Sequence, residues 1–218
     1  MMVTSLFENK PPTVHIGAKI KNKIPVFVYL NVGEYEPGGS DVSYRFQATG
    51  ERYMLTELTI QELLLQMPKE FLSMASEAEI QAIMRAFGCN DDLQAWGDMR
   101  IAQINAHDSS NEVNHFTIKG ITGWLDKNTR VALVNMYQLH QKLEGVSLPA
   151  LWVDGNKIEF ESVEGALKAL AKIEVYASQC YAATQELLCT IKQFMETQQL
   201  LEIQTFEYRS HYPPAITL

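Results

Sequence analysis

Two histidines and two carboxylates stand close together in the chain, and together they could bind a divalent metal ion. They are His107, Asp108, Glu112 and His115, and imidazole nitrogens and carboxylate oxygens are ligands that zinc takes from proteins. No neighbouring pattern fixes the loop geometry or supplies the hydrogen bonds that orient metal ligands. We therefore favour a hydrophilic linker that happens to contain two histidines, and we expect no metal ion and no cofactor.

A cysteine nucleophile could be built from Cys180 and one of the five histidines. Cys180 falls on an apolar helical stripe, however, which favours a buried and inert thiol. Asp91 and Asp92 resemble a carboxylate pair, but consecutive side chains on a helix diverge, so both are better explained as partners of a helix dipole. His140 lies near the end of a predicted helix, where a partial positive charge interacts favourably with the helix dipole.

The motifs of common enzyme classes are missing from the sequence. The segment "EPGGSD" lacks the lysine and the following helix of a phosphate-binding loop. Neither Gly-x-Ser-x-Gly, Cys-x-x-Cys nor His-Glu-x-x-His occurs. We expect no catalytic residue and no enzymatic activity.

The composition is that of a folded, acidic protein. Of the 218 residues, 46% are hydrophobic and 20% are charged, and the formal net charge is −8. An acidic surface argues against binding to nucleic acid and to anionic membranes. No apolar run approaches the roughly 18 residues that span a bilayer, and the first residues lack the pattern of a secretory signal.

The three cysteines are expected to be reduced, as in a protein made in the cytoplasm. Cys180 and Cys189 fall in one predicted helix, where their separation gives a rise of about 13.5 Å. A disulfide requires Cα atoms within about 7 Å, so this pair cannot form one.

Residues 13–56 predict a small antiparallel sheet. "TVHIGAKI" and "IPVFVYL" alternate as two strands around a polar turn, and "EYEPGGSD" reads as a loop. "VSYRFQ" and "RYMLTE" flank "ATGE", which predicts a second hairpin.

The middle of the chain is predicted to be helical. Thr59 with Glu62, and Ser76 with Glu79, have the spacing of capping boxes. Gly88 is a natural left-handed end for the second of these helices. Asn90 is expected to cap a third helix, and "HDSSNEVN" reads as a linker.

The last hundred residues or so have the most regular pattern. "HFTIKGI" predicts a short strand, and Asp126 an N-cap for a helix that runs to Leu143 and ends at Gly145. Trp124 is expected to fold over the first turn of that helix. Asp154-Gly155 predicts a type I′ hairpin, and Ser162 is expected to cap the longest helix, which runs to about Met195.

An apolar stripe follows that helix from Val163 to Phe194, with Thr184 as its polar member. A stripe of this length must be covered, either by the shorter helices or by a second copy of the chain. Aromatic residues crowd the same part of the sequence, and we favour a core position for Trp152. The tail tyrosines could equally belong to the core or to a partner surface. The crowded aromatics are Trp152, Phe160, Tyr176, Tyr181, Phe206, Tyr208 and Tyr212.

These patterns predict an α+β protein: a small antiparallel β region at 1–57, a helical middle at 58–112, and a module at 113–218. In the last region a β-hairpin would pack on a long helix and a helical hairpin.

Four blocks of this last region come in a familiar order: "TGWLDKNTRVALVNMY", "LWVDGNKIEF", "ALKALAKIEVYASQCYAATQ" and "FEYRSHYPP". Over about residues 117 to 214 the chain resembles a family, catalogued as a domain of unknown function, from the tail region of bacteriophages and prophages. The segment "TQELLCTIKQF" departs from the family, whose members usually carry a histidine there. The family-like positions are Trp124, Asp126, Trp152, Tyr176, Cys180, Tyr181, Tyr208 and Tyr212.

The resemblance implies a non-enzymatic structural protein of a tailed phage, located in the virion at the tail, baseplate or fibre and made in the host cytoplasm. Its expected partners are other tail or fibre proteins. The apolar stripe separately leaves open a second copy of the chain bound through the helix at 163–195. The alternative is a tail-fibre assembly chaperone, with Trp152 and the aromatic tail binding an unfolded fibre end. An accessory lysin or depolymerase would need a carboxylate pair in a cleft, and no convincing pair is placed for it.

Overall fold

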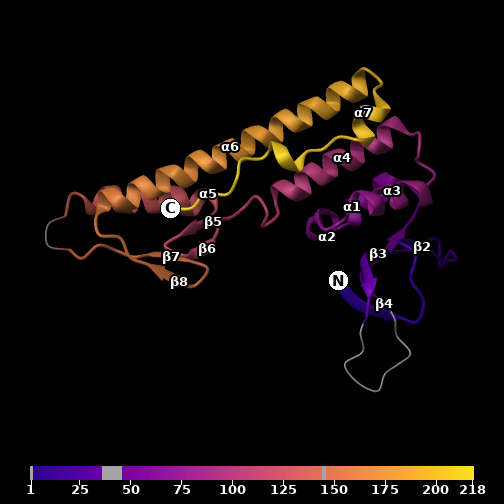
Figure 1. Cartoon of the computed structure of the whole chain (residues 1–218), viewed down its shortest axis with the longest axis horizontal. Helices are drawn as coiled ribbons and strands as arrows, with labels where there is room; N and C mark the ends of the chain where they lie inside the picture. Colours follow the sequence, from indigo (N-terminus) through magenta and orange to yellow (C-terminus); the bar gives the residue numbers. More distant parts are fainter. Residues whose placement is uncertain (1, 36–45, 144–145) are drawn as a thin grey trace. The chain divides into compact units, whose positions relative to one another are not determined.

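The computed structural model of the chain describes residues 2–35, 46–143 and 146–218 (Figure 1). It confirms the predicted α+β class: an N-terminal antiparallel sheet, a helical middle, and C-terminal hairpins with one long helix. No helix in the described part of the chain is both long and apolar enough to cross a membrane.

Contacts group the chain into two compact units. Unit 1 comprises Met1–Ala106 and Leu188–Phe206, and unit 2 comprises His107–Leu187 and Glu207–Leu218. The three regions predicted from the sequence are continuous stretches of the chain. Each of the two units, in contrast, joins segments that are far apart in the sequence.

Unit 1 contains a four-stranded antiparallel sheet with the strand order β1-β4-β3-β2. One face is apolar because Val26, Val28 and Leu30 alternate along β3, and all three are fully buried. The strands are β1 (Val3–Phe7), β2 (Val14–Ile16), β3 (Ile24–Glu34) and β4 (Phe46–Leu55).

The predicted second hairpin at "ATGE" is wrong where the structure describes it. Residues 46–55 form one continuous strand, and Gly50 pairs with Val3 on one side and Tyr29 on the other. A Cβ on Gly50 would lie only 2.8 Å from the Tyr29 ring, so the glycine provides room for a side chain rather than a turn. The strand β1 was not predicted, and most of the loop "EYEPGGSD" lies outside the described residues.

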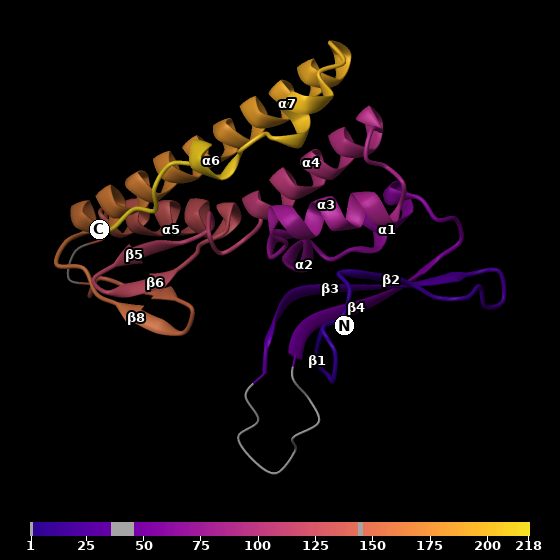
Figure 2. The ribbon, with the colours of Figure 1, turned by 45° about the vertical axis from the view of Figure 1, so that its right-hand side comes forward.

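Helices α1 to α3 cover one face of the sheet (Figure 2). Buried residues of the sheet and of these helices form one core with α4 and Ile203. The helices of this unit are α1 (Ile60–Gln66), α2 (Lys69–Ser73), α3 (Glu77–Ala86), α4 (Leu93–Asp108, which enters unit 2 at its end) and α7 (Leu200–Gln204).

The capping box at Ser76 and Glu79 is confirmed. The other oxygen of the Glu79 carboxylate accepts a hydrogen bond from the Asn31 N–H at 2.6 Å, where β3 shifts register. A residue predicted for a local role therefore also fixes helix α3 to the sheet. Gly88 has φ +71° after α3, as expected for a left-handed helix end.

The other two caps of this unit differ from the prediction. Thr59 does cap α1, but the Glu62 carboxylate accepts hydrogen bonds from the N–H groups of Thr56 and Glu57, both at 2.7 Å. The cap of α4 is formed by Asp92, whose carboxylate accepts from the Ala95 N–H at 3.0 Å. The carbonyl of Asn90, which was expected to cap that helix, accepts from the Trp96 indole instead.

Unit 2 is built from short hairpins, α5, the first part of α6 and the C-terminal segment. The hairpin at Asp154-Gly155 is confirmed, with φ +46° and +77° as a type I′ turn requires. The elements of unit 2 are β5 (Phe116–Ile118), β6 (Ile121–Gly123), α5 (Lys127–His140), β7 (Leu151–Val153), β8 (Asn156–Ile158), α6 (Val163–Glu196, which ends in unit 1) and the 3-10 turn η1 (Arg209–His211).

Two boundaries in unit 2 differ from the prediction. "HFTIKGI" forms the hairpin β5–β6 rather than one strand, because Lys119 and Gly120 both adopt positive φ. Helix α5 ends at His140, earlier than the predicted Leu143, and Gly145 lies outside the described residues.

The apolar stripe of α6 is confirmed, since every member is buried or half-buried within its own chain. Ser162 caps this helix by accepting from the Gly165 N–H at 3.1 Å. The fully or nearly fully buried members are Leu170, Ile173, Cys180, Thr184, Leu187 and Ile191.

Candidate functional site

A buried polar cluster in unit 2 brings together several residues that the sequence analysis singled out. Its centre is Thr184 on α6, whose hydroxyl is 2.7 Å from Asp108 Oδ1 and 2.9 Å from the Tyr212 hydroxyl. The Cys180 carbonyl lies 3.1 Å from the same hydroxyl and is a second acceptor for its proton. Thr184 was predicted only as the polar member of an apolar stripe, and that exception was the sequence signal for the cluster.

His107 lies between two tail tyrosines. Its ring centroid is 5.6 Å from that of Tyr208 and 4.9 Å from that of Tyr212, and both contacts are edge-to-face. Residues 107 and 108 form the last turn of α4, so the predicted linker begins too early. The surrounding helix and tail bury the ring, which leaves the imidazole 4% exposed.

Burial lowers the pKa of His107, because desolvation disfavours the charged imidazolium, and the nearby Glu112 carboxylate opposes this effect. His107 Nδ1 is 3.4 Å from a carboxylate oxygen of Glu112, which also pairs with Arg209 at 3.3 Å. Within the part of the chain that the structure describes, no group of three or more His, Cys, Asp and Glu side chains is arranged to hold a metal ion.

Tyr176 and Cys180 extend the cluster along α6. The Tyr176 hydroxyl donates to the Val113 carbonyl at 2.7 Å, which fixes the chain just after α4 to the long helix. Burial raises the pKa values of the Tyr176 hydroxyl and the Cys180 thiol. The predicted burial of Cys180 is confirmed, and a protonated, buried thiol is a poor nucleophile. Among the other cysteines, Cys89 is half-buried and Cys189 exposed.

Trp124 and Asp126 lie at the start of α5. Asp126 caps the helix through hydrogen bonds from the N–H groups of Asn128 and Thr129, at 2.9 and 3.0 Å. The Trp124 ring packs against the Arg130 guanidinium at 5.4 Å, one turn into the helix. Arg130 was not predicted, yet it is buried and pairs with Glu174 of α6 at 2.6 Å.

Trp152 is the main disagreement with the sequence analysis, because its side chain is 60% exposed rather than in the core. In β7 the residues on either side, Leu151 and Val153, are buried, so the strand alternation turns the tryptophan outward. It pairs with Lys157 across the hairpin on the same outward face. Tyr181 on α6 is likewise 65% exposed.

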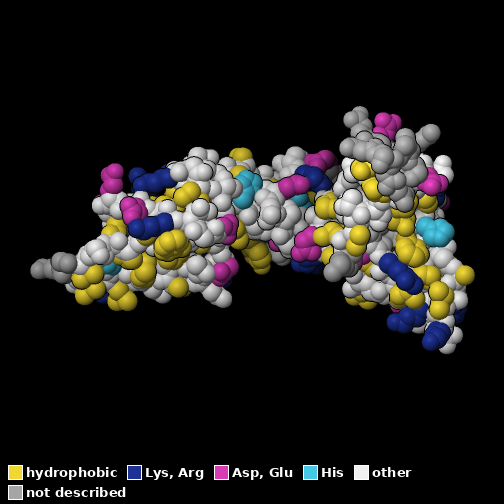
Figure 3. Space-filling view, turned by 90° about the horizontal axis from the view of Figure 1, so that it is seen from below, with side chains coloured by type: hydrophobic (Ala, Val, Ile, Leu, Met, Phe, Trp, Pro, Cys, Tyr) yellow, Lys and Arg dark blue, Asp and Glu magenta, His cyan; other side chains and the backbone are white. Residues whose placement is uncertain are grey.

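Further apolar side chains near Trp152 in the sequence are also exposed, namely Leu139, Leu143 and Val146. The space-filling view shows exposed hydrophobic side chains on this unit (Figure 3). The candidate residues therefore fall into three groups, of which Trp124 and Asp126 at the start of α5 are the first. Tyr176, Cys180, Tyr208 and Tyr212 belong to the closed cluster, whereas Trp152 and Tyr181 are available to a partner.

We compared the chain with family models, curated proteins and solved structures, and it matches none of them. The resemblance to phage tail-region proteins therefore stays a prediction from the four sequence blocks.

Proposed function

We propose that the protein is a non-enzymatic structural component of a tailed bacteriophage, associated with the tail, baseplate or fibre, that acts by packing against other virion proteins. Two independent lines support this proposal. The four sequence blocks suggest the phage context, and the exposed Trp152 suggests a surface for a protein partner.

The observation that carries the proposal is the exposure of Trp152 on a rigid hairpin. Tryptophan is enriched among the residues that dominate interface energies, and an exposed aromatic ring on a fixed backbone loses little entropy on binding. The hairpin is fixed because Leu151, Val153 and Ile158 on its inner face are at most 2% exposed.

The polar cluster supports a packing role rather than a reaction. Its hydroxyl groups bond to one another, to the Asp108 carboxylate and to the Val113 carbonyl, and these bonds join the end of α4 and the tail to α6. Such a cluster holds the module in one conformation, which is what a building block of a larger assembly needs.

Mass spectrometry of purified particles tests the placement. The chain should be present in intact virions of the phage or prophage that encodes it, and its absence would refute the proposal. Trp152→Ala should leave the folded chain as stable as the wild type but reduce its incorporation into particles. Leu201→Ala removes an equally exposed apolar side chain (68%) from unit 1 and should not reduce incorporation.

The alternative is a tail-fibre assembly chaperone that leaves after assembly. The tail tyrosines that it would use are half-buried or buried in the cluster, so this hypothesis depends on Trp152. Co-expression with the neighbouring fibre gene distinguishes the two: a chaperone should raise the yield of soluble fibre and then be absent from particles.

A further inference from the structure

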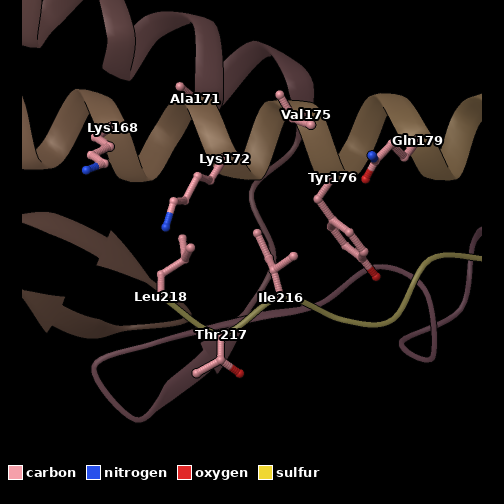
Figure 4. A pocket seen from close by; sticks show the side chains of 9 residues that line it. All are labelled: Lys168, Ala171, Lys172, Val175, Tyr176, Gln179, Ile216, Thr217 and Leu218. Carbon is pink, nitrogen blue, oxygen red and sulfur yellow. The ribbon is translucent and has the colours of Figure 1, made fainter.

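A groove runs along unit 2 between the first part of α6 and the segment 216–218 (Figure 4). Its volume is about 520 Å³, within the range of pockets that bind small ligands or peptide side chains. We call it the lysine groove and define it by Lys168, Lys172, Val175, Ile216, Thr217 and Leu218. In Figure 4, Lys172 and Tyr176 extend from the helix toward the segment, and Ile216 and Leu218 extend toward the helix.

The groove is cationic in an acidic protein. Lys168 and Lys172 are one helical turn apart and therefore lie on one face of α6. An adjoining hollow of about 210 Å³ shares both lysines and adds Lys119, while neither lining includes an Asp or Glu side chain. Among the described residues, no carboxylate forms an ion pair with Lys168 or Lys172.

Apolar side chains line the groove beside these charges. Val175 is 58% exposed, and Ile216 and Leu218 line the opposite side. The chain carries a net charge of −8, so two unpaired ammonium groups beside an apolar strip are a local exception. A partner that matches both features carries carboxylates and apolar side chains.

The segment 216–218 also offers a strand edge. It pairs in parallel with β5 through the Thr117 N–H to the Ile216 carbonyl (2.9 Å) and the Leu218 N–H to the Thr117 carbonyl (2.8 Å). Because backbone groups alternate along an extended strand, the N–H and C=O of Thr217 point away from β5. Thr217 is exposed and lines the groove, so these groups can pair with an added strand.

We infer that the lysine groove binds an extended acidic segment of a partner protein. The segment pairs with the backbone of Thr217, its apolar side chains contact Val175 and Ile216, and its carboxylates pair with Lys168 and Lys172. This inference goes beyond the proposed function and does not depend on it, because it concerns the chemistry of the partner and not the place of the protein in a particle.

The first test uses the full chain and a fluorescein-labelled peptide of about six residues, the length of an ordinary strand, in which valine and glutamate alternate. Fluorescence anisotropy should show binding that weakens with added salt. A peptide with lysine in place of glutamate should bind at least about ten-fold more weakly. Equal binding of the two peptides, or no binding of the acidic one, would overturn the inference.

The second test locates the peptide-binding site on the protein. Lys168→Glu with Lys172→Glu should weaken binding of the acidic peptide by about ten-fold or more. Lys127→Glu with Lys142→Glu makes the same change in net charge at exposed positions outside the groove, and it should have less than about a two-fold effect. An equal loss in both double variants would mean general electrostatic attraction and would also overturn the inference.

The third test addresses the strand edge, since the charge-reversed variants do not probe it. An acidic peptide with N-methyl groups along one backbone edge keeps its charge and side chains but cannot donate along that edge. It should bind about ten-fold more weakly when the methylated edge faces Thr217. Two peptides, methylated on opposite edges, that both bind like the parent would rule out the pairing.

Discussion

The hydroxyl groups of Thr184 and Tyr212 lie 2.9 Å apart, and this contact attaches the C-terminal tail to the middle of α6. The same Thr184 hydroxyl is 2.7 Å from Asp108 at the end of α4. Three segments that are distant in the sequence therefore depend on one side-chain oxygen. Burial raises the pKa of Tyr212 to about 12, so its hydroxyl stays protonated and able to donate.

Thr184→Val keeps the shape of the side chain and removes this hydroxyl. We expect a loss of about 1–3 kcal/mol in the free energy of unfolding, because Asp108 and Tyr212 lose a partner inside the protein. Urea denaturation measures the change. Ser178→Ala removes an exposed hydroxyl from the same helix and should change stability by less than about 0.5 kcal/mol; an equal loss in both variants would contradict the role given to Thr184.

His107 makes unit 2 sensitive to acid. Its pKa in the folded protein lies below the value of about 6.5 for an unfolded histidine. Between these two values the unfolded chain binds more protons than the folded chain, so stability decreases as the pH falls through about 6.5 and below. Four charged groups modify the pKa of His107: Glu112, Asp108 and Glu207 raise it, and Arg209 lowers it.

His107→Phe should flatten that part of the pH dependence, because phenylalanine keeps a ring between Tyr208 and Tyr212 but does not titrate. Denaturation midpoints measured from pH 7.5 to 5 would show it. His211→Gln removes an exposed histidine from the same unit and should retain the wild-type profile. A His107→Phe profile as steep as that of the wild type would show that other groups cause the acid sensitivity.

Gly123→Ala tests the packing of β6 on the β7–β8 hairpin. A Cβ at this position would collide with the side chains of Val153 and Asp154, so the hairpin must shift, at a cost of about 1–3 kcal/mol. Thermal or urea unfolding measures that cost. Gly33→Ala, where a Cβ would meet nothing within 4 Å, is the matched control and should be close to neutral.

Arg100→Met tests a buried charge in unit 1. The guanidinium is 1% exposed and donates to both Glu77 oxygens at 2.7 Å, to the Ile203 carbonyl at 2.9 Å and to the Gln204 carbonyl. Its removal leaves the Ile203 and Gln204 carbonyls without this donor, whereas water can reach the half-exposed Glu77 carboxylate. We therefore expect a loss of about 1–3 kcal/mol in the free energy of unfolding. Arg85→Met, at an exposed position on α3, should cost less than about 0.5 kcal/mol. A loss as small at Arg100 as at Arg85 would contradict the assigned network.

Sequence patterns located most of the helices because helix ends are specified by neighbouring residues. Ser76 with Glu79, Asp126 and Ser162 each satisfy backbone N–H groups within three residues, and the structure confirms all of them. The prediction that Asn90 caps α4 was wrong for an equally local reason, because Asp92, two residues further on, provides the cap of that helix.

The sequence by itself determined the turns and faces that depend on local φ angles and side-chain periodicity, such as Asp154-Gly155 and the stripe of α6. Only the tertiary structure decided which way Trp152 faces, that Gly50 lies inside a strand, and that His107, Thr184 and Tyr212 meet. These outcomes depend on contacts between residues that are far apart in the chain. The burial of shared apolar surface selects those contacts, and a short window of sequence contains no information about it.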